Sequence, residues 1–412
     1  MTRCTVGVMA YNEEQTIRAV LYALLSQRTH ACEIVEIVVV ASGCTDRTVE
    51  RANEVARDHP LITVDVQAER AGKAAAINRL IAVARGDVIV LVGADTLPDP
   101  DALEHLVRPF ARAGVGMTGA RVVPLNDPRT FIGFTVQVLW HVHHRMALRW
   151  PKLGELVAFR NVIAALPENT ATDEVALEAL ISAQGYRLVY TPEAIVYNYG
   201  PETLDDFLLQ RRRIFAGHLH IAAVYNYVAA SLPIRNLLML ASSSVERYPS
   251  LLPLLVGSML LECWGRALGA IDTLLQHRHH IWKPAASTKK LGRKRTSLTL
   301  ITLYCSADSV NPAQLMRAVR HVPDAAGTLL WWDYYNSAML LLLPQDEIPG
   351  VSLEEYIRLL MQRISPHISV VSYRVVRFND STAVVQGTAD HPVRQERRAH
   401  PAEEGLASPI SI

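Results

Sequence analysis

The chain has 412 residues, of which 50% are hydrophobic and 20% are charged, and its formal net charge is +1. This length allows two or three domains, and the near-neutral charge argues against a general nucleic-acid-binding protein. No signal peptide is recognised in the opening MTRCTVGVMAYNEE. No Cys-x-x-Cys pair occurs, so neither a disulfide framework nor a zinc site is expected, and a reducing compartment fits best. The cysteines are Cys4, Cys32, Cys44, Cys263 and Cys305.

The first hundred residues alternate between apolar strands and amphipathic helices. Continuous apolar strands that are joined by helices are typical of a parallel sheet covered on both faces. Ligands of such sheets bind at the carboxyl ends of the strands. The predicted strands are 4–10, 33–42, 61–68 and 87–94, and the predicted helices are 13–27, 45–59 and 72–85.

A polar cluster follows each of these four strands. Each cluster alone is a weak signal, because Asp46 could simply cap the next helix and Lys73 could be a solvated residue in a first helical turn. All four fall at the same edge of one sheet, which favours a ligand site there. The clusters are AYNEE (10–14), ASGCTDRT (41–48), ERAGKAAAIN (69–78) and GADT (93–96).

An apolar segment and a basic segment follow the α/β region. The run PSLLPLLVGSMLL (249–261) is shorter than the roughly 20 residues that span a bilayer, and extending it would add Glu262 and Arg266, which are costly at that depth. Residues 277–295 contain Lys and Arg but no Asp or Glu, as expected beside an anionic cytoplasmic leaflet. We predict in-plane or re-entrant helices at the cytoplasmic face of a membrane. Two passes, with one in 219–245, and a soluble core helix with an ordinary linker are the alternatives.

The last part reads as a small separate domain. Its strands and helices are predicted in the order βαββαβ, which is the ferredoxin-like plan. We therefore divide the chain into an α/β domain, apolar helices with a basic linker, a ferredoxin-like α+β domain and a disordered polar tail. The boundaries are 1–220, 221–296, 297–387 and 388–412.

Several segments between residues 3 and 220 together resemble the family 2 glycosyltransferases. The resemblance implies a GT-A fold, a Rossmann-like and mostly parallel sheet of the nucleotide-diphospho-sugar transferases. It also implies transfer of a sugar, with inversion, from a nucleoside diphosphate donor, with UDP preferred, assisted by Mg²⁺ or Mn²⁺. A position at the membrane suits a lipid-linked or envelope glycan acceptor. The segments are YNEE, SGCTDRT, GKAAAIN, ARGDVIVLVGADT, TDEVAL and QRRRI.

The resemblance assigns roles to individual residues. Asp46 would accept a hydrogen bond from the base, and Lys73 would lie near the nucleotide or its phosphates. Asp95 would hold the cation, since carboxylate and phosphate oxygens are the ligands of Mg²⁺ and Mn²⁺. The residues placed around the donor are Ala10, Tyr11, Asn12, Glu13, Asp46, Lys73, Ala94, Asp95, Gln210 and Arg213.

The chain departs from the family pattern at three places. The usual Asp-x-Asp begins here with Gly93, so we expect weaker metal binding. The catalytic base, usually in Thr-Glu-Asp-x-x-Leu, falls in TDEVAL, where register favours Glu174 and Asp173 is the alternative. Ile214 replaces the Trp of Gln-x-x-Arg-Trp, which makes a processive synthase less expected.

Other functions compete with this prediction. A catalytically impaired sugar-nucleotide sensor or scaffold is supported by Gly93 and the exchanged acids. A sugar-phosphate nucleotidyltransferase would need a Gly-rich loop where this chain has AYNEE. The C-terminal domain faintly resembles a GGDEF domain without its signature residues, so a regulatory, dimerising or partner-docking role rests on analogy. His141, His143 and His144 do not share one helix face, so one could reach the acceptor cleft but a zinc site is not expected.

Overall fold

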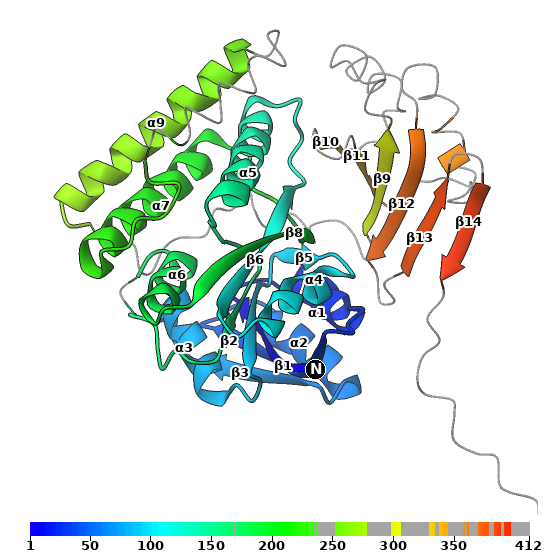
Figure 1. The fold of residues 1–412 in the computed structure, drawn as a ribbon, viewed down its shortest axis with the longest axis horizontal. Helices are drawn as coiled ribbons and strands as arrows, with labels where there is room; N and C mark the ends of the chain where they lie inside the picture. Colours follow the sequence, from blue (N-terminus) through cyan, green and yellow to red (C-terminus); the bar gives the residue numbers. More distant parts are fainter. Residues whose placement is uncertain are drawn as a thin grey trace, which may run out of the picture.

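The computed structural model shows an α/β domain, a pair of long helices and a second sheet formed by the C-terminal strands (Figure 1). The structure describes residues 1–168, 170–233, 236, 252–277, 298–305, 329–333, 338–344, 357–358, 361, 370–378, 383–388 and 391–396.

The α/β domain contains an eight-stranded sheet with the order β3-β2-β1-β4-β7-β6-β8-β5. The pairs β1–β2, β1–β4, β2–β3 and β6–β8 are parallel, whereas β7 runs antiparallel to both β4 and β6. The four strands predicted from the first hundred residues correspond to β1, β2, β3 and β4. The strands are β1 (Thr2–Ala10), β2 (Cys32–Ser42), β3 (Ile62–Gln67), β4 (Val88–Gly93), β5 (Thr96–Pro98), β6 (Val115–Pro124), β7 (Val157–Arg160) and β8 (Arg187–Asn198).

Helices cover both faces of this sheet because its central strands are apolar on both sides. Successive side chains of a strand point to opposite faces. Along β4, Val88, Val90 and Val92 therefore pack in the core beneath α1, α2 and α4, while Ile89 and Leu91 pack in the core beneath α3 and α6. The helices are α1 (Ile17–Leu25), α2 (Thr48–Asp58), α3 (Lys73–Val83), α4 (Ala102–Val107), α5 (Phe131–Arg149) and α6 (Asp173–Ala183).

Two long helices, α7 (Leu204–Tyr225) and α9 (Leu252–Leu274), pack against each other beside the α/β domain (Figure 1). Charged side chains form this contact. Glu262 of α9 is 1% exposed and accepts hydrogen bonds from Arg211 of α7 at 2.7 and 2.8 Å and from Arg266 at 2.8 Å. Arg212 pairs in the same way with the buried Asp272. Because a buried carboxylate must be paired, α9 turns its charged side towards α7 and its apolar side outward.

The second sheet has the order β10-β11-β9-β12-β13-β14, with antiparallel neighbours throughout. The order and directions of its first four strands agree with the predicted ferredoxin-like plan. The two helices predicted between these strands lie almost wholly outside the described residues. The strands are β9 (Leu298–Cys305), β10 (Leu329–Asp333), β11 (Ala338–Pro344), β12 (Val370–Phe378), β13 (Ala383–Thr388) and β14 (His391–Glu396).

The disordered tail was predicted to begin at residue 388, but the structure has a strand, β14, beyond that residue. β13 pairs with β12, and β14 pairs with β13. An edge strand tolerates Pro and carries charged side chains that discourage further pairing, so HPVRQE has a composition that suits an edge strand as well as a tail. Residues 397–412 of the predicted tail, and nearly all of the basic segment 277–295, lie outside the described residues.

The buried charges between α7 and α9 should contribute strongly to stability. We expect Glu262→Ala to lower the free energy of unfolding by about 3–5 kcal/mol, because Arg211 and Arg266 would lose their carboxylate partner. Glu50→Ala breaks the exposed Arg47–Glu50 pair and should change the free energy of unfolding far less, because exposed ion pairs are screened by water. Urea denaturation followed by circular dichroism measures both losses. Small and equal losses would contradict a structural role for Glu262.

Candidate active site

A cavity of about 500 Å³ lies at the carboxyl ends of β1, β2 and β4 and reaches residues of α5, α6, α7 and α9. The sheet brings to this one place side chains that are far apart in the sequence. The predicted site residues that line the cavity are Ala10, Tyr11, Glu13, Lys73, Asp95, Asp173, Glu174, Gln210 and Arg213.

The other predicted donor residues are not among those that line the cavity, and they shape the loops beside it. The side-chain oxygen of Asn12, a residue with φ of 52°, accepts a hydrogen bond from the Thr45 N–H at 2.8 Å. The Asp46 carboxylate accepts hydrogen bonds from the Glu14 N–H at 3.1 Å and the Thr48 N–H at 3.0 Å. These bonds join the loops after β1 and β2. Asp46 stands one residue before the N-cap of α2, which is Arg47, so it supports the start of this helix without being its cap. The residues concerned are Asn12, Asp46 and Ala94.

An aromatic ring and a guanidinium group stack where β1 and β3 end. Arg70 lies 4.0 Å from the centre of the Tyr11 ring, in cation–π contact, and both residues line the cavity. Sequence reasoning missed Arg70, whose one signal is a basic residue three positions before Lys73. Together they offer a flat surface and a positive charge, which suit the base and phosphates of a nucleotide.

Lys73, at the start of α3, joins two carboxyl groups at the start of α6. Its Nζ atom lies 2.6 Å from Glu174 Oε1 and 3.7 Å from Asp173 Oδ2. Burial opposes ionisation of both acids. At Glu174 the ion pair with Lys73 outweighs burial and lowers the pKa, whereas at Asp173 burial prevails and raises the pKa. Two adjacent acids with opposite shifts are typical of sites in which one acid stays ionised and the other exchanges a proton.

A third carboxyl group, that of Glu155, also lines the cavity and was not predicted. Glu155 lies between α5 and β7 with φ of 60°, in the left-handed region that is uncommon for glutamate. Burial raises the pKa of Glu155 to about 7, and the negative charges of Asp95 and Glu174 reinforce this shift. Its sequence signal was slight, a single acid just before a short apolar strand.

Gly93, which replaces the first acid of the family pattern, makes room for Asp95. A Cβ atom at position 93 would lie 2.6 Å from Asp95 Oδ1, so the Asp95 carboxylate occupies the space that a side chain would need. Ala94 between them is buried, and its N–H donates to the Met9 carbonyl at 3.1 Å. Within the described part of the chain, no group of three or more His, Cys, Asp or Glu side chains could hold a metal ion.

The residues of QRRRI divide between two tasks because successive helical positions point in different directions. Arg211 and Arg212 are held by the acids of α9. Arg213 points towards α6, where its Nη1 donates to the Ala171 carbonyl at 3.4 Å, and burial lowers its pKa. Gln210 and Arg213 line the cavity, as do Arg211 and Ile214, so the two positions that match the family pattern are also at the site.

Two histidines, His143 of α5 and His218 of α7, line the cavity together with apolar side chains. His143 lines the cavity, with its ring edge-on to Trp140 at 5.1 Å. His144 instead meets the Tyr190 hydroxyl at 2.8 Å, inside the protein. One histidine of the HVHH segment therefore reaches the cavity.

Close packing of α7 against the start of α6 fixes the acids at the cavity. A Cβ atom at Gly217 would lie 2.7 Å from Cγ2 of Thr172, which directly precedes Asp173. The missing side chain at this position lets α7 approach the N-terminus of α6 closely. Gly217 thereby helps to place both carboxyl groups.

Two family models match the chain and together extend over the α/β domain and both long helices. The model of glycosyl transferase family 2 matches residues 5–170, and the model of glycosyl transferase family group 2 matches residues 88–269. Each model thus matches less than half of the chain, and the matched residues 5–170 lie within the α/β domain. The fold of this α/β domain is the predicted GT-A fold.

Two bacterial proteins are among the curated relatives of this chain. The poly-β-1,6-N-acetyl-D-glucosamine synthase of Staphylococcus aureus is 26% identical over 224 residues, which are 51% of this chain and 53% of that protein. The probable glycosyltransferase YdaM of Bacillus subtilis is 25% identical over 239 residues, which are 54% of this chain and 56% of that protein. The chain thus spans about half the length of the curated relatives it matches.

A solved structure shares the fold of the α/β domain. The mannosyltransferase PcManGT from Pyrobaculum calidifontis, determined in complex with GDP-Man and Mn²⁺, superposes with a TM-score of 0.51 at 23% identity. The match covers 67% of this chain and 88% of that protein. At this identity the likeness shows the fold, and the roles of the cavity residues rest on their own geometry.

Proposed function

We propose that this protein transfers a sugar, with inversion, from a UDP-linked donor to a hydroxyl group of a lipid-linked or envelope glycan acceptor. The observation that carries the proposal is the pair Asp173–Glu174 beside Lys73, in the same cavity as Asp95. Such a cavity holds a proton acceptor and an ionised acid next to the place where a metal-bound diphosphate would lie. The name of the Staphylococcus aureus relative, a polysaccharide synthase, supports a glycan as the acceptor.

The donor would lie across the carboxyl ends of the strands. Tyr11 and Arg70 would hold the nucleotide, and Arg213 would bind a phosphate through its planar guanidinium. Asp95, with Glu155 within electrostatic reach, would hold Mg²⁺ or Mn²⁺. Such sites use one or two carboxylates plus substrate phosphates. When bound, the cation neutralises negative charge on the departing nucleoside diphosphate.

Asp173 is the better candidate for the catalytic base, although register alone favours Glu174. A base works best when its pKa lies near the working pH. Burial raises the pKa of Asp173 towards that range, whereas the pair with Lys73 keeps Glu174 a weak base. In this mechanism Asp173 takes the proton of the acceptor hydroxyl as its oxygen attacks the anomeric carbon. Glu174 holds Lys73 in place.

Substitutions at the two acids test the mechanism. We expect Asp173→Asn to lower kcat by about 10²–10⁴-fold, because the base is lost while the shape remains. Glu174→Gln should reduce kcat much less. The assay follows nucleotide release from UDP-, GDP- and dTDP-sugars with Mn²⁺ or Mg²⁺. The reverse order of effects would assign the base to Glu174. If the native protein consumes no donor under any condition, the proposed catalytic function is wrong. The catalytically impaired sugar-nucleotide sensor or scaffold then remains.

The pH profile of kcat/KM provides a second test. Because the pKa of Asp173 is raised, the base becomes protonated as the pH falls through that value, so kcat/KM should fall on the acid side. The midpoint should lie above the ordinary Asp value of about 3.9. Asp173→Glu should keep an acid limb with a shifted midpoint. A flat profile for the native protein over this range would contradict the role of Asp173.

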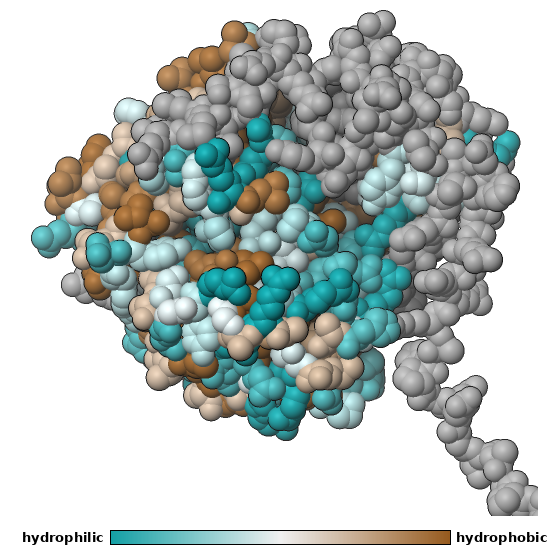
Figure 2. Space-filling view, viewed as in Figure 1, coloured by the Kyte–Doolittle hydropathy of each residue, from teal (hydrophilic) through white to brown (hydrophobic). Residues whose placement is uncertain are grey.

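We also propose that α9 lies in the plane of a membrane surface. By length and composition alone, α9 is the one described helix that could cross a bilayer. Its polar side is paired with α7, however, while Leu260 and Trp264 are 66% and 57% exposed on the other side. Apolar side chains gather over both ends of α9 in Figure 2. An apolar outer face next to a basic segment suits a helix that lies on anionic lipid.

Vesicle flotation of the full chain tests this orientation. We expect binding to phosphatidylglycerol-containing vesicles and a loss of at least half of the bound fraction in Leu260→Glu/Trp264→Glu. Val66→Glu alters an exposed apolar residue of β3 and should bind as the native protein does. Carbonate should release the protein from cell membranes. Resistance to carbonate would indicate a spanning helix instead, and equal flotation of all variants would exclude α9 as the contact.

A further inference from the structure

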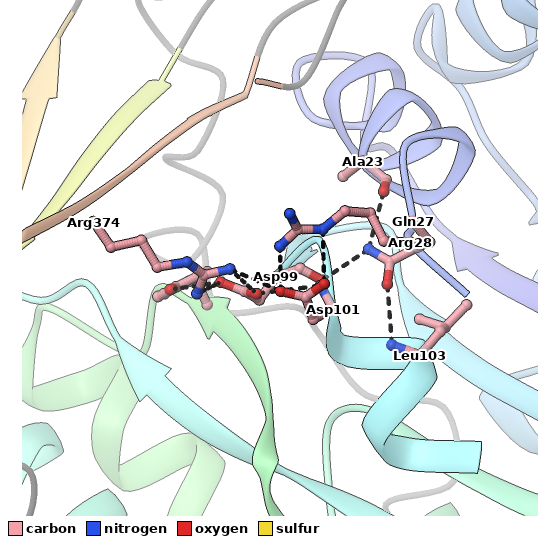
Figure 3. A network of polar contacts seen from close by, with 8 residues as sticks. Ala23, Gln27, Arg28, Asp99, Asp101, Leu103 and Arg374 are labelled. Atoms are coloured by element: carbon pink, nitrogen blue, oxygen red, sulfur yellow. Dashed lines mark hydrogen bonds and ion pairs between the residues drawn. The ribbon is translucent and has the colours of Figure 1, made fainter. Parts of the chain in front are cut away.

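The C-terminal sheet contacts the α/β domain through one arginine, which pairs with two neighbouring aspartates (Figure 3). Arg374, on β12, donates from Nη1 and Nη2 to the two carboxylate oxygens of Asp99, both at 2.9 Å, and from Nη2 to Asp101 Oδ2 at 3.1 Å. This bidentate geometry is the strongest form of an arginine–carboxylate pair. Leu300 and Val376 of the same sheet join the apolar core that contains β1 and α1.

The cluster is buried, so its charges depend on one another. The Asp99 side chain is 4% exposed and that of Arg374 is 13% exposed. Asp99 also accepts a hydrogen bond from the Tyr197 hydroxyl at 3.2 Å, and Asp101 pairs with Arg28 of the loop after α1. Without Arg374, Asp99 would keep a buried negative charge beside a second carboxylate, which is strongly unfavourable.

Asp99 lies four residues after Asp95, on a buried segment whose backbone is also held by the Asp99 N–H, which donates to the Ile195 carbonyl at 2.9 Å, and by the Pro100 carbonyl, which accepts from the Arg28 N–H at 2.8 Å. The strand between Asp95 and Asp99, β5, has three residues and lies at the edge of the sheet, where it pairs with β8 alone. Beyond β5, the Asp99 carbonyl accepts from the Gln27 side chain at 2.8 Å, and Gln27 in turn accepts from the Leu103 N–H at 3.0 Å (Figure 3). The Asp99 side chain is tied by Tyr197 and Arg374.

Tyr197 connects the same cluster to a second segment that lines the cavity. It pairs with Leu97 of β5, and the next two residues of the chain, Asn198 and Tyr199, line the cavity. The Asp99–Arg374 pair therefore holds two cavity segments together, the one that carries Asp95 and the one that ends β8.

We propose that Arg374 is a positioning residue for the donor site, through which the C-terminal sheet sets the placement of Asp95. The proposal rests on the proposed function for its ligand, since Asp95 would hold the cation under the diphosphate. A change in the C-terminal domain that withdraws Arg374 would loosen β5 and weaken metal-dependent donor binding. The reverse also follows, because coupling between two sites is reciprocal: donor and cation would tighten the docking of the C-terminal sheet.

Two measurements on the full chain test this inference. Arg374→Gln should weaken binding of UDP with Mn²⁺ by about tenfold, within the 5- to 150-fold range of typical site-to-site coupling. It should also speed amide hydrogen exchange in residues 95–101 by a similar factor without any ligand. Arg79→Gln removes an exposed pair with Asp65 and should change neither quantity. Arg374→Lys keeps the positive charge but cannot make the bidentate contact with Asp99, so its effects on nucleotide affinity and on amide exchange should be intermediate.

A double variant guards against a general loss of folding. Arg374→Gln/Asp99→Asn removes both buried charges, and we expect it to recover most of the exchange protection. Unchanged exchange in 95–101 and unchanged UDP–Mn²⁺ affinity in folded Arg374→Gln would overturn the proposal. Native protein that fails to bind any nucleotide would refute the proposed function, and the exchange measurement would still decide whether Arg374 positions the segment.

Discussion

The contact of Lys73 with Asp173 and Glu174 joins two distant parts of the candidate active site. Lys73 begins the helix after β3, whereas the two acids begin the helix after β7, so one ammonium group joins two sequence segments a hundred residues apart. Lys73 and Glu174 are partly buried and Asp173 is buried, so the nearby cation favours the ionised form of each acid. Burial raises the pKa of both acids, and their net pKa shifts are opposite because Glu174 lies nearer to Lys73 than Asp173 does.

The first hundred residues could be predicted closely from the sequence, because the two-sided burial of β1 to β4 leaves continuous apolar runs. The convergence of Tyr11, Lys73 and Asp95 also followed, since parallel strands deliver their following loops to one edge. Asp173 was placed with them by the family resemblance alone. Sequence reasoning failed where the property of a residue depends on neighbours that are close in space but distant in the sequence. Glu155 is an ordinary acid in the sequence, and its raised pKa depends on Asp95 and Glu174.

The same limit explains α9 and the C-terminal sheet. From the sequence, Glu262 and Arg266 interrupted an apolar run and argued for a short segment. In the structure they pair with each other and with Arg211, and one helix of 23 residues forms. Nothing in the sequence indicated that Arg374 and Asp99 form an ion pair, because 275 positions separate them. Paired buried charges look like ordinary surface charges until both partners are known.

The two sides of α9 have a consequence for the route of an acceptor. Glu262 and Arg266 line the cavity, while Leu260 and Trp264 of the same helix face outward. A single helix, about 10–12 Å thick with its side chains, thus separates the cavity from the outer apolar surface. An acceptor whose tail stays in lipid would need only a short polar head to reach Asp173. The protein would then work as a thin partition between a lipid surface and an aqueous donor.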